Sequence, residues 1–494
     1  MSEEKKSTRP ESPRAETAAK TFRVPASNPW ANAWKLAAGV GVAGLVIGGA
    51  GYSANPNRFA FSYLLGFEVA LSIALGATFF VIIQHLTSAG WSVTVRRTGE
   101  FLSYGLVIMA LLFAPVWGMK ERLFPWIGKT TGEHHASTTE VSTTHLTQHT
   151  QEKTPTDGPA REPKAGEQHG VDTSHGATSP SGVANQVHGS SGHGAAMTHG
   201  APDPHEMEEA HIMHKKSWWL TLGFFNFRAV LYFLIWAGLG YFLFSRSVKQ
   251  DSTKDVGPTM ALKTFAAPAA ILFALSLTFA GFDWVMSLQP MWFSTIFGVY
   301  LFAGSFVAAL AVIILIAHGL RQTGLMQKEI TVEHFHDLGK LLFGFNVFWA
   351  YIGFSQFMLI WYAALPEETP FYHARWYTDT SSHIETGWKF VSLSLLFVHF
   401  VIPFVFLISR NVKRRLQLLP IGAAILLFMH VVDIYWLVMP NVPNFELGQI
   451  WIDIGCVLGV VGIYAAFVFK QMASNPLIPM GDPRLPRALH FENV

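Results

Sequence analysis

Ten long apolar segments dominate this chain of 494 residues and limit the folds that it can adopt. A helix that crosses the hydrocarbon core of a bilayer needs about 20 predominantly apolar residues. In lipid, only helices and closed barrels satisfy their own backbone hydrogen bonds, and apolar segments of this length favour helices. The sequence therefore predicts an all-α integral membrane protein with transmembrane helices at 36–52, 59–87, 99–118, 218–244, 264–285, 295–318, 341–363, 389–408, 418–438 and 450–470.

The composition supports a membrane protein and excludes other classes. Half of the residues are hydrophobic and 14% are charged, against roughly 25% charged residues in an average soluble domain. A net charge of +2 gives no basic footprint for nucleic acid. Cys456 is the only cysteine, which excludes an intramolecular disulfide, a covalently attached c-type haem and a thiolate-ligated cluster. Any such redox centre must belong to a partner.

Lysine and arginine are distributed unevenly between the two ends of the predicted helices. The tails and loops on the side of the amino terminus hold 23 of them, whereas the other side holds 11, of which eight lie in 119–217. Short basic loops stay cytoplasmic, and long loops count little. We therefore expect cytoplasmic tails at 1–35 and 471–494, helices one to three within 36–118, and helices four to ten within 218–470. The charged, Pro-rich first 35 residues do not resemble a cleavable signal peptide.

The outer segment 119–217 differs in composition from the rest of the chain. It carries 12 of the 21 histidines among glycine, serine, threonine and proline. Such a segment cannot bury a core, so we expect a largely disordered periplasmic loop. Histidines without a fixed spacing favour a solvated, weakly metal-binding loop over a defined site, and we predict no metal centre. The stretch "HEMEEAHIMHKK" at its end predicts a short interfacial helix.

Ionisable residues inside the predicted helices are candidates for function, because each costs at least about 2.5 kcal/mol at the bilayer centre. The candidates near the outer end are Glu68, Arg228, Asp283, His430, Asp433 and Asp453, beside the neutral Ser355 and Gln356. Those near the cytoplasm are His85, Arg96, Arg97, Glu100 and His318. Water is available at the cytoplasmic interface, which favours an ordinary interfacial role for His85 and Glu100.

His430 and Asp433 are three residues apart and therefore share one face of a helix. A carboxylate can orient a neighbouring imidazole and raise its proton affinity, which suits the acceptance of a proton from a quinol hydroxyl. A buried pair that only locks the helices together is the structural alternative. Glu68 and Arg228 present a similar choice, between a proton relay and an ion pair inside one bundle.

His399 lies near mid-membrane, on the helix before that of His430. Two imidazoles on consecutive antiparallel helices can hold a b-type haem. Only this pair offers such ligands, whereas a dihaem cytochrome needs two pairs. A b-type haem subunit therefore stays an alternative.

Three long segments resemble a known family. The runs "FFNFRAVLYFLIWAGLGYFLFSRSVKQD", "FDWVMSLQPMWFSTIFGVYLFAG" and "DLGKLLFGFNVFWAYIGFSQFMLIWYAALPEE" look like the second quinone-binding-type membrane subunit of bacterial Alternative Complex III. This subunit belongs to the polysulfide-reductase, or NrfD-like, superfamily. The resemblance runs from about the second helix to the tenth. It does not cover the His-rich loop or the charged amino terminus.

The resemblance implies a fold, a function and partners. Helices 2–5 and 6–9 would form two four-helix bundles, with two peripheral helices. The complex oxidises quinol and reduces cytochrome c or a terminal oxidase in the bacterial cytoplasmic membrane. Its other members would be a sibling NrfD-like subunit, an iron-sulfur protein, multihaem and monohaem cytochromes c, and small membrane subunits. Quinone or quinol is then the candidate ligand, and haem and iron-sulfur centres lie in the partners.

From the residues and the resemblance together, we expect a membrane subunit without its own redox metal that supports quinol oxidation and translocates protons. His430 and Asp433 would accept protons, Asp283 would be an exit carboxylate, and Glu68 with Arg228 would relay protons in the first bundle. An interfacial Asp283 that only ends a helix is the bland alternative for that residue. A scaffold subunit without a quinone site and a standalone transporter are the rival functions.

Overall fold

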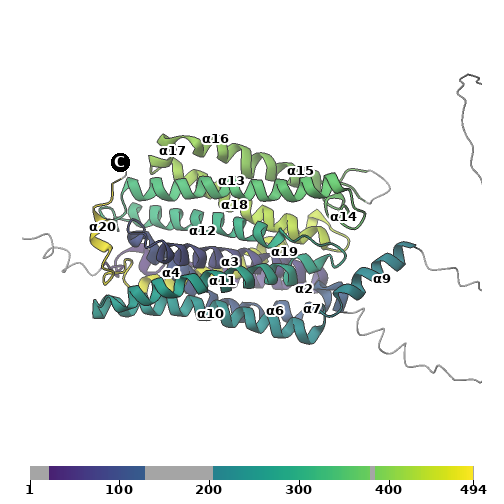
Figure 1. The fold of residues 1–494 in the computed structure, drawn as a ribbon, viewed down its shortest axis with the longest axis horizontal. Coiled ribbons are helices and arrows are strands. Elements are labelled where there is room, and N and C mark those ends of the chain that lie inside the picture. Colours follow the sequence, from purple (N-terminus) through teal and green to yellow (C-terminus); the bar gives the residue numbers. More distant parts are fainter. Residues whose placement is uncertain (1–21, 128–203, 379–383, 493–494) are drawn as a thin grey trace, which may run out of the picture.

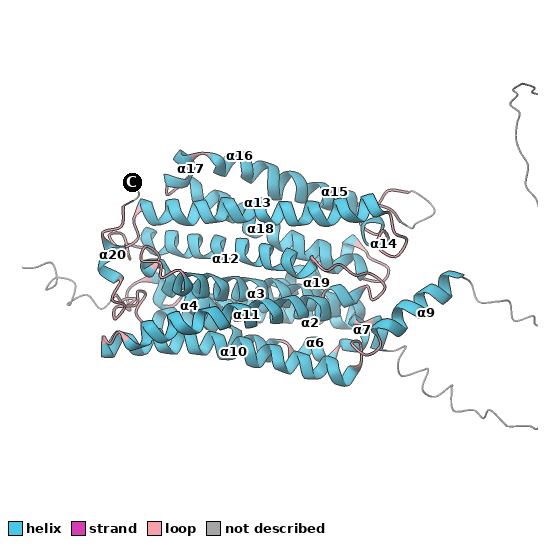
Figure 2. Ribbon diagram, viewed as in Figure 1, coloured by secondary structure: helices cyan, strands magenta, loops and turns pink. Residues whose placement is uncertain are grey.

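A computed structural model describes residues 22–127, 204–378 and 384–492 of the chain. Ten of its helices are long and apolar enough to cross a membrane, and no β-strand occurs within these residues. Figure 1 shows the long helices lying side by side, with α20 (Leu485–Leu489) at one end and α9 (Pro204–Lys216) at the other. Figure 2 shows loops and turns between successive helices of the described residues. The predicted all-α membrane fold is confirmed.

The ten spans lie where the sequence predicts them. They are α2 (Ala33–Ala54), α3 (Pro56–Leu86), α4 to α6 (Val93–Gly118), α10 (Leu222–Thr253), α11 (Gly257–Trp284) with the following turn to Leu288, α12 (Phe297–Gln322), α13 (Val332–Ala363), α15 to α16 (Trp388–Ile408), α18 (Leu418–Val438) and α19 (Ile450–Ser474). Most of the differences are polar extensions at helix ends. For example, α13 begins nine residues before its apolar part, because Thr331 and His334 form a capping box there.

The helices form two bundles of four. The first bundle consists of α3, α4 to α6, α10 and α11. The second consists of α12, α13, α15 to α16 and α18. Helix α3 packs on α12 across the boundary, while α2 and α19 form a peripheral pair against α3. The two predicted four-helix bundles and two peripheral helices are therefore confirmed. In the most apolar 18-residue stretch of α3, 89% of the residues are buried inside the protein. Helix α3 is therefore the central helix of the molecule.

Small residues let α2 and α19 approach closely. A Cβ added to Gly44 would lie 2.4 Å from the backbone nitrogen of Gly459, and one added to Gly455 would lie 2.6 Å from that of Gly48. In a bilayer, such backbone contact drives helix association through van der Waals packing. The expectation that Gly44 and Gly48 pack on another helix is confirmed.

We expect Gly44→Leu to separate α2 from α19, because no side chain fits at this contact. Overpacking typically costs about 1–3 kcal/mol, so the thermal unfolding midpoint in detergent should fall. Gly39→Leu is the matched control on the same helix, since nothing lies within 4 Å of a Cβ at Gly39. Equal midpoints for the two variants would contradict the packing assigned to this seam.

Candidate functional site

Asp433 is the centre of a buried polar cluster in the second bundle. Its side chain projects from α18 and accepts hydrogen bonds from the Tyr300 hydroxyl of α12 and from Trp349 Nε1 of α13, the latter at 3.0 Å. The Trp349 ring stacks on His399, with ring centroids 3.8 Å apart. Asp433 is 1% exposed. The carboxylate thus joins three helices of one bundle in the absence of bulk water.

His430 contacts the first bundle through one of its ring nitrogens, Nε2. Its Nε2 lies 2.7 Å from the Ser72 hydroxyl of α3, while its buried Nδ1 has no hydrogen-bond partner in the described part of the chain. Among the described residues, His430 and Asp433 share no hydrogen bond, so the direct orientation of the imidazole by this carboxylate is not observed. Their spacing does place them on one face, but the neighbouring helices supply a different partner for each.

Gly304 of α12 leaves room for both side chains. A Cβ at Gly304 would lie 3.3 Å from His430 Nδ1 and 3.5 Å from Asp433 Oδ2. A side chain at this position would crowd the imidazole and the carboxylate together. The free nitrogen of His430 and one oxygen of Asp433 therefore face the same small region beside α12.

The Ser72 hydroxyl determines which ring nitrogen of His430 carries the proton. Its hydroxyl also lies 2.9 Å from the Val69 carbonyl oxygen. A hydroxyl has one proton, so donation to Val69 leaves His430 to donate from Nε2 and makes Nδ1 an acceptor. Donation from Ser72 to His430 gives the opposite tautomer. The hydroxyl can thus switch between two arrangements without any movement of a helix.

Glu68 lies on α3 one helical turn before Ser72, on the same face. It is 7% exposed, and its Oε1 has no hydrogen-bond partner among the described residues. The expected pairing of Glu68 with Arg228 is wrong, because Arg228 pairs with Asp283 instead. Glu68 is a buried carboxyl with unused hydrogen-bonding capacity next to the residue that contacts His430.

Arg228 of α10 and Asp283 of α11 form a bidentate ion pair. Nε lies 2.7 Å from Oδ2, and Nη2 lies 2.7 Å from Oδ1. Trp219 Nε1 and the Tyr232 hydroxyl donate to the same carboxylate, each at 2.8 Å. Asp283 lies one residue before the outer end of α11 and is fully buried among side chains, so water does not reach the carboxylate. Because its oxygens already accept four hydrogen bonds, Asp283 fits a structural ion pair better than an exit carboxylate.

Asp453 has the same kind of partner. Arg58 Nε donates to its Oδ1 at 2.9 Å, and the Ser62 hydroxyl lies 2.5 Å from that oxygen. This pair ties the start of α3 to α19. The sequence argument missed Arg58 because it belongs to the first turn of a helix, where a basic residue is ordinary. Gln356 bonds to Ser294 and Tyr372, whereas Ser355 is exposed and bonds only to its own helix.

A haem between His399 and His430 does not fit this packing. His399 lies against the face of Trp349, and His430 Nε2 is already bonded to Ser72. The remaining imidazole nitrogens of both residues are buried without exposed surface. No room is left at these nitrogens for an iron porphyrin, which needs an open face at each axial ligand.

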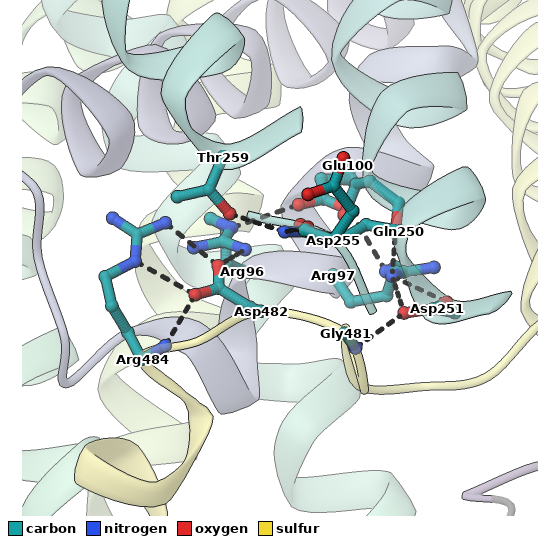
Figure 3. A network of polar contacts seen from close by, with 11 residues as sticks. Arg96, Arg97, Glu100, Gln250, Asp251, Asp255, Thr259, Gly481, Asp482 and Arg484 are labelled. Atoms are coloured by element: carbon teal, nitrogen blue, oxygen red, sulfur yellow. Dashed lines mark hydrogen bonds and ion pairs between the residues drawn. The ribbon is translucent and has the colours of Figure 1, made fainter. Parts of the chain in front are cut away.

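Three of the cytoplasmic candidates, Arg96, Arg97 and Glu100, form a separate network with the carboxyl-terminal segment (Figure 3). Its charged members are Arg96, Arg97, Glu100, Asp251, Asp482 and Arg484. Arg96 lies 3.0 Å from Glu100 and 2.6 Å from Asp482, and Arg97 lies 2.9 Å from Asp251. Glu100, Arg96, Arg97 and Asp482 are buried, whereas Asp251 and Arg484 are partly exposed, so the expected access of water to Glu100 is wrong. His85 is buried as well, whereas His318 is partly exposed and bonds to Gln322.

Asp482 fixes the carboxyl-terminal segment to the first bundle. Burial would raise the pKa of its carboxyl, but the charges of Arg96 and Arg484 outweigh burial and hold the pKa below its usual range. Gly481 beside it allows the contact, because a Cβ there would lie 1.9 Å from the Gln250 carbonyl oxygen. The segment is thus held by charge pairing at a position that admits only glycine.

We expect Asp482→Asn to loosen residues 475–491 and to leave the bundles folded. A carboxyl whose pKa is lowered in the folded state stabilises above its unfolded pKa, about 3.9, and this stabilisation fades as the pH falls through the lower folded value. The expected result is a lower hydrogen-exchange protection of the segment, relative to the intrinsic exchange rate at the same pH, in the variant at pH 7 and in the wild type only under acid conditions. Unchanged exchange in Asp482→Asn would contradict this role.

The fold and the buried side chains define the class of this protein. It is a multi-pass, all-helical membrane protein with two four-helix bundles and a polar cluster at their junction. No family model matches the chain, and no curated protein matches it.

Proposed function

We propose that this chain is a membrane subunit of a quinol:cytochrome c, or quinol:terminal oxidase, oxidoreductase of the Alternative Complex III type, and that it conducts protons between its two bundles. The observation that carries the proposal is the contact of 2.7 Å between Ser72 of the first bundle and His430 of the second. It joins the polar residues of one bundle to those of the other inside an otherwise apolar core. Buried ionisable groups in a membrane protein mark proton relays by default.

The relay runs from Glu68 through Ser72 to His430 and Asp433. Glu68 has an oxygen free to bind a proton, and Ser72 is one turn away on the same helix. The Ser72 hydroxyl accepts a proton on one side as it gives its own to the other, so it can pass a proton to His430 Nε2. His430 then releases a proton from Nδ1 towards the region that it shares with Asp433. Tyr300 and Trp349 stabilise the carboxylate that results when Asp433 gives the proton up.

The remaining ion pairs hold the relay in place. Arg228 with Asp283 and Arg58 with Asp453 are satisfied on both sides, so they do not exchange protons with the relay. The resemblance to Alternative Complex III implies a bacterial cytoplasmic membrane, and the distribution of lysine and arginine favours cytoplasmic positions for both termini. Partners supply the haem and iron-sulfur centres. The iron-sulfur protein and the cytochromes c would receive the electrons of the quinol.

Purification from native membranes tests the partnership. A tagged chain extracted in mild detergent should co-purify with haem-stained proteins, and the isolated subunit should show no visible haem absorption of its own. A chain that purifies alone would favour a standalone transporter. A haem spectrum in the isolated subunit would overturn both the proposal and the poor fit for haem described above.

A scaffold subunit is the second candidate. It is favoured by the two saturated ion pairs, which stabilise the bundles and have no capacity left for chemistry. The scaffold would seat the sibling subunit and the cytochromes without conducting protons. Wild-type turnover and proton translocation in variants of Glu68, His430 and Asp433 would support the scaffold.

A further inference from the structure

Basic side chains gather at the turn that joins α16 (Ile402–Ile408) to α18. Four of the six residues at 410–415, "RNVKRR", are arginine or lysine. Most of them belong to α17 (Arg410–Arg414), a short helix that packs on α13, α16 and α18. Figure 1 shows α17 at the same end of the helices as α20 and the carboxyl terminus. This is the cytoplasmic side in the orientation that the charge distribution favours.

Two contacts hold α17 in a fixed place. The Lys413 ammonium donates to the carbonyl oxygens of Leu407 at 2.7 Å and Ile408 at 3.0 Å, so it caps the end of α16. Arg414 forms a bidentate ion pair with Glu333 at the start of α13, with Nη1 2.8 Å from Oε2. Helix α17 is therefore anchored to both neighbouring helices, which fixes the position of Arg410 in advance of any ligand.

Arg410 and Lys340 are exposed cations on this surface. Both interact electrostatically with His336, so they lie on the same side of α13. Lys340 is half-exposed and pairs with Asp337 of its own helix. Arg410 and Arg415 are exposed, and their side chains have no hydrogen bond or ion pair within the described residues. These three residues, with Lys413 and Arg414, make up the basic cluster.

The cytoplasmic end of the first bundle differs, because its arginines find counter-charges inside the protein. Arg96, Arg97 and Arg484 each bond to a carboxylate there. In the basic cluster, Glu333 and Asp337 each bond to one cation, and the exposed arginines keep their full charge. A positive field therefore remains at the surface of the second bundle, and an anion from outside the chain fits it.

An apolar stripe leads from the basic cluster into the membrane. Val401, Val405 and Ile408 are exposed and recur at the four-residue and three-residue spacing of one helix face. Ile408 ends this span two residues before Arg410. The cations therefore lie at the level of lipid headgroups, directly above side chains that contact acyl chains.

The cluster and the stripe together identify the occupant. Fixed cations at the end of a span, next to an exposed apolar helix face, are complementary to a lipid with a negative headgroup. We propose that the basic cluster binds an anionic phospholipid of the cytoplasmic leaflet, with its headgroup at Arg410 and Lys340 and an acyl chain along α16. The lipid supplies the counter-charge that the first bundle obtains from its own carboxylates. This binding does not depend on proton conduction by the bundles.

Lipid binding to the full chain tests this site. The protein is stripped of lipid in an uncharged detergent and mixed with phosphatidylglycerol or with phosphatidylcholine of the same acyl chains, and bound lipid is measured by native mass spectrometry. We expect the wild type to prefer phosphatidylglycerol. One cation near the surface contributes a factor of about five, so Arg410→Gln should weaken phosphatidylglycerol binding about fivefold. Arg410→Gln with Lys340→Gln should weaken it about 25-fold, with phosphatidylcholine binding unchanged.

Two further variants sharpen the test. Arg246→Gln removes an exposed arginine at the same end of α10, in the first bundle, and should keep the wild-type preference. Asp337→Asn removes the carboxylate that pairs with Lys340, so it should strengthen phosphatidylglycerol binding, which a purely structural cluster does not predict. Because these side chains lie at the surface, the variants should unfold at the wild-type midpoint before lipid is added. Equal binding of both lipids by the wild type, or an undiminished preference in the Arg410 and Lys340 double variant, would overturn the proposal.

Discussion

Asp283→Asn should destabilise the protein by about 3–5 kcal/mol, because it leaves the guanidinium of Arg228 buried without its counter-charge. Both oxygens of Asp283 bond to Arg228 at 2.7 Å, and the Arg228 side chain is 5% exposed. The loss should appear as a large drop in the unfolding midpoint in detergent. Glu385→Gln is the matched control: its pair with Lys389 is solvent-exposed, and exposed pairs contribute about 0–1 kcal/mol.

A double variant separates charge pairing from packing. Arg228→Met together with Asp283→Leu removes both charges and fills similar space, and well-packed apolar replacements of buried ion pairs are often neutral. We therefore expect the double variant to be more stable than Asp283→Asn. The Trp219 and Tyr232 donors would lose their acceptor, so recovery should be incomplete. A double variant less stable than either single change would show that the pair itself does not account for the loss.

The sequence predicts the helices well because their apolar lengths are a direct response to the bilayer. Span limits differ mainly where helices continue past the membrane. The last turns of α10, "SVKQDST", are polar yet helical, since Arg97 and Gly481 bond to Asp251 there. Hydropathy identifies the part of a helix that lies in lipid. It does not identify the polar turns by which a helix continues beyond the membrane.

Partners of buried charges could not be predicted in the same way. Depth alone places Glu68, Asp283 and Arg228 at one level, but the rotation of α3, α10 and α11 decides which carboxylate meets the arginine. His430 and Asp433 share a face of α18, yet they bond to different neighbouring helices. His430 contacts Ser72, and Asp433 accepts a hydrogen bond from Trp349. Neither Ser72 nor Trp349 stands out from the sequence, because serine and tryptophan are common in membrane helices.

The largest functional effect is expected for the residues that connect the bundles. In the intact complex reconstituted in vesicles, Asp433→Asn and Glu68→Gln should each lower proton translocation about a hundredfold, the lower range for loss of a positioned acid or base. Asparagine and glutamine keep the size of the side chain but cannot bind and release a proton. A pH-sensitive dye inside the vesicles reports translocation, and quinol oxidation measured in the same sample reports electron transfer.

Ser72→Ala isolates the connection from the charges at its ends. It removes the hydroxyl that meets His430 at 2.7 Å and leaves every ionisable group in place. Ser355→Ala is the matched control, because Ser355 is exposed and bonds only to Tyr351 of its own helix. A relay requires Ser72→Ala to lose translocation while Ser355→Ala keeps it. If Ser72→Ala and Asp433→Asn assemble normally and translocate protons at the wild-type rate, the junction is structural, and the chain acts as a scaffold for the redox subunits around it.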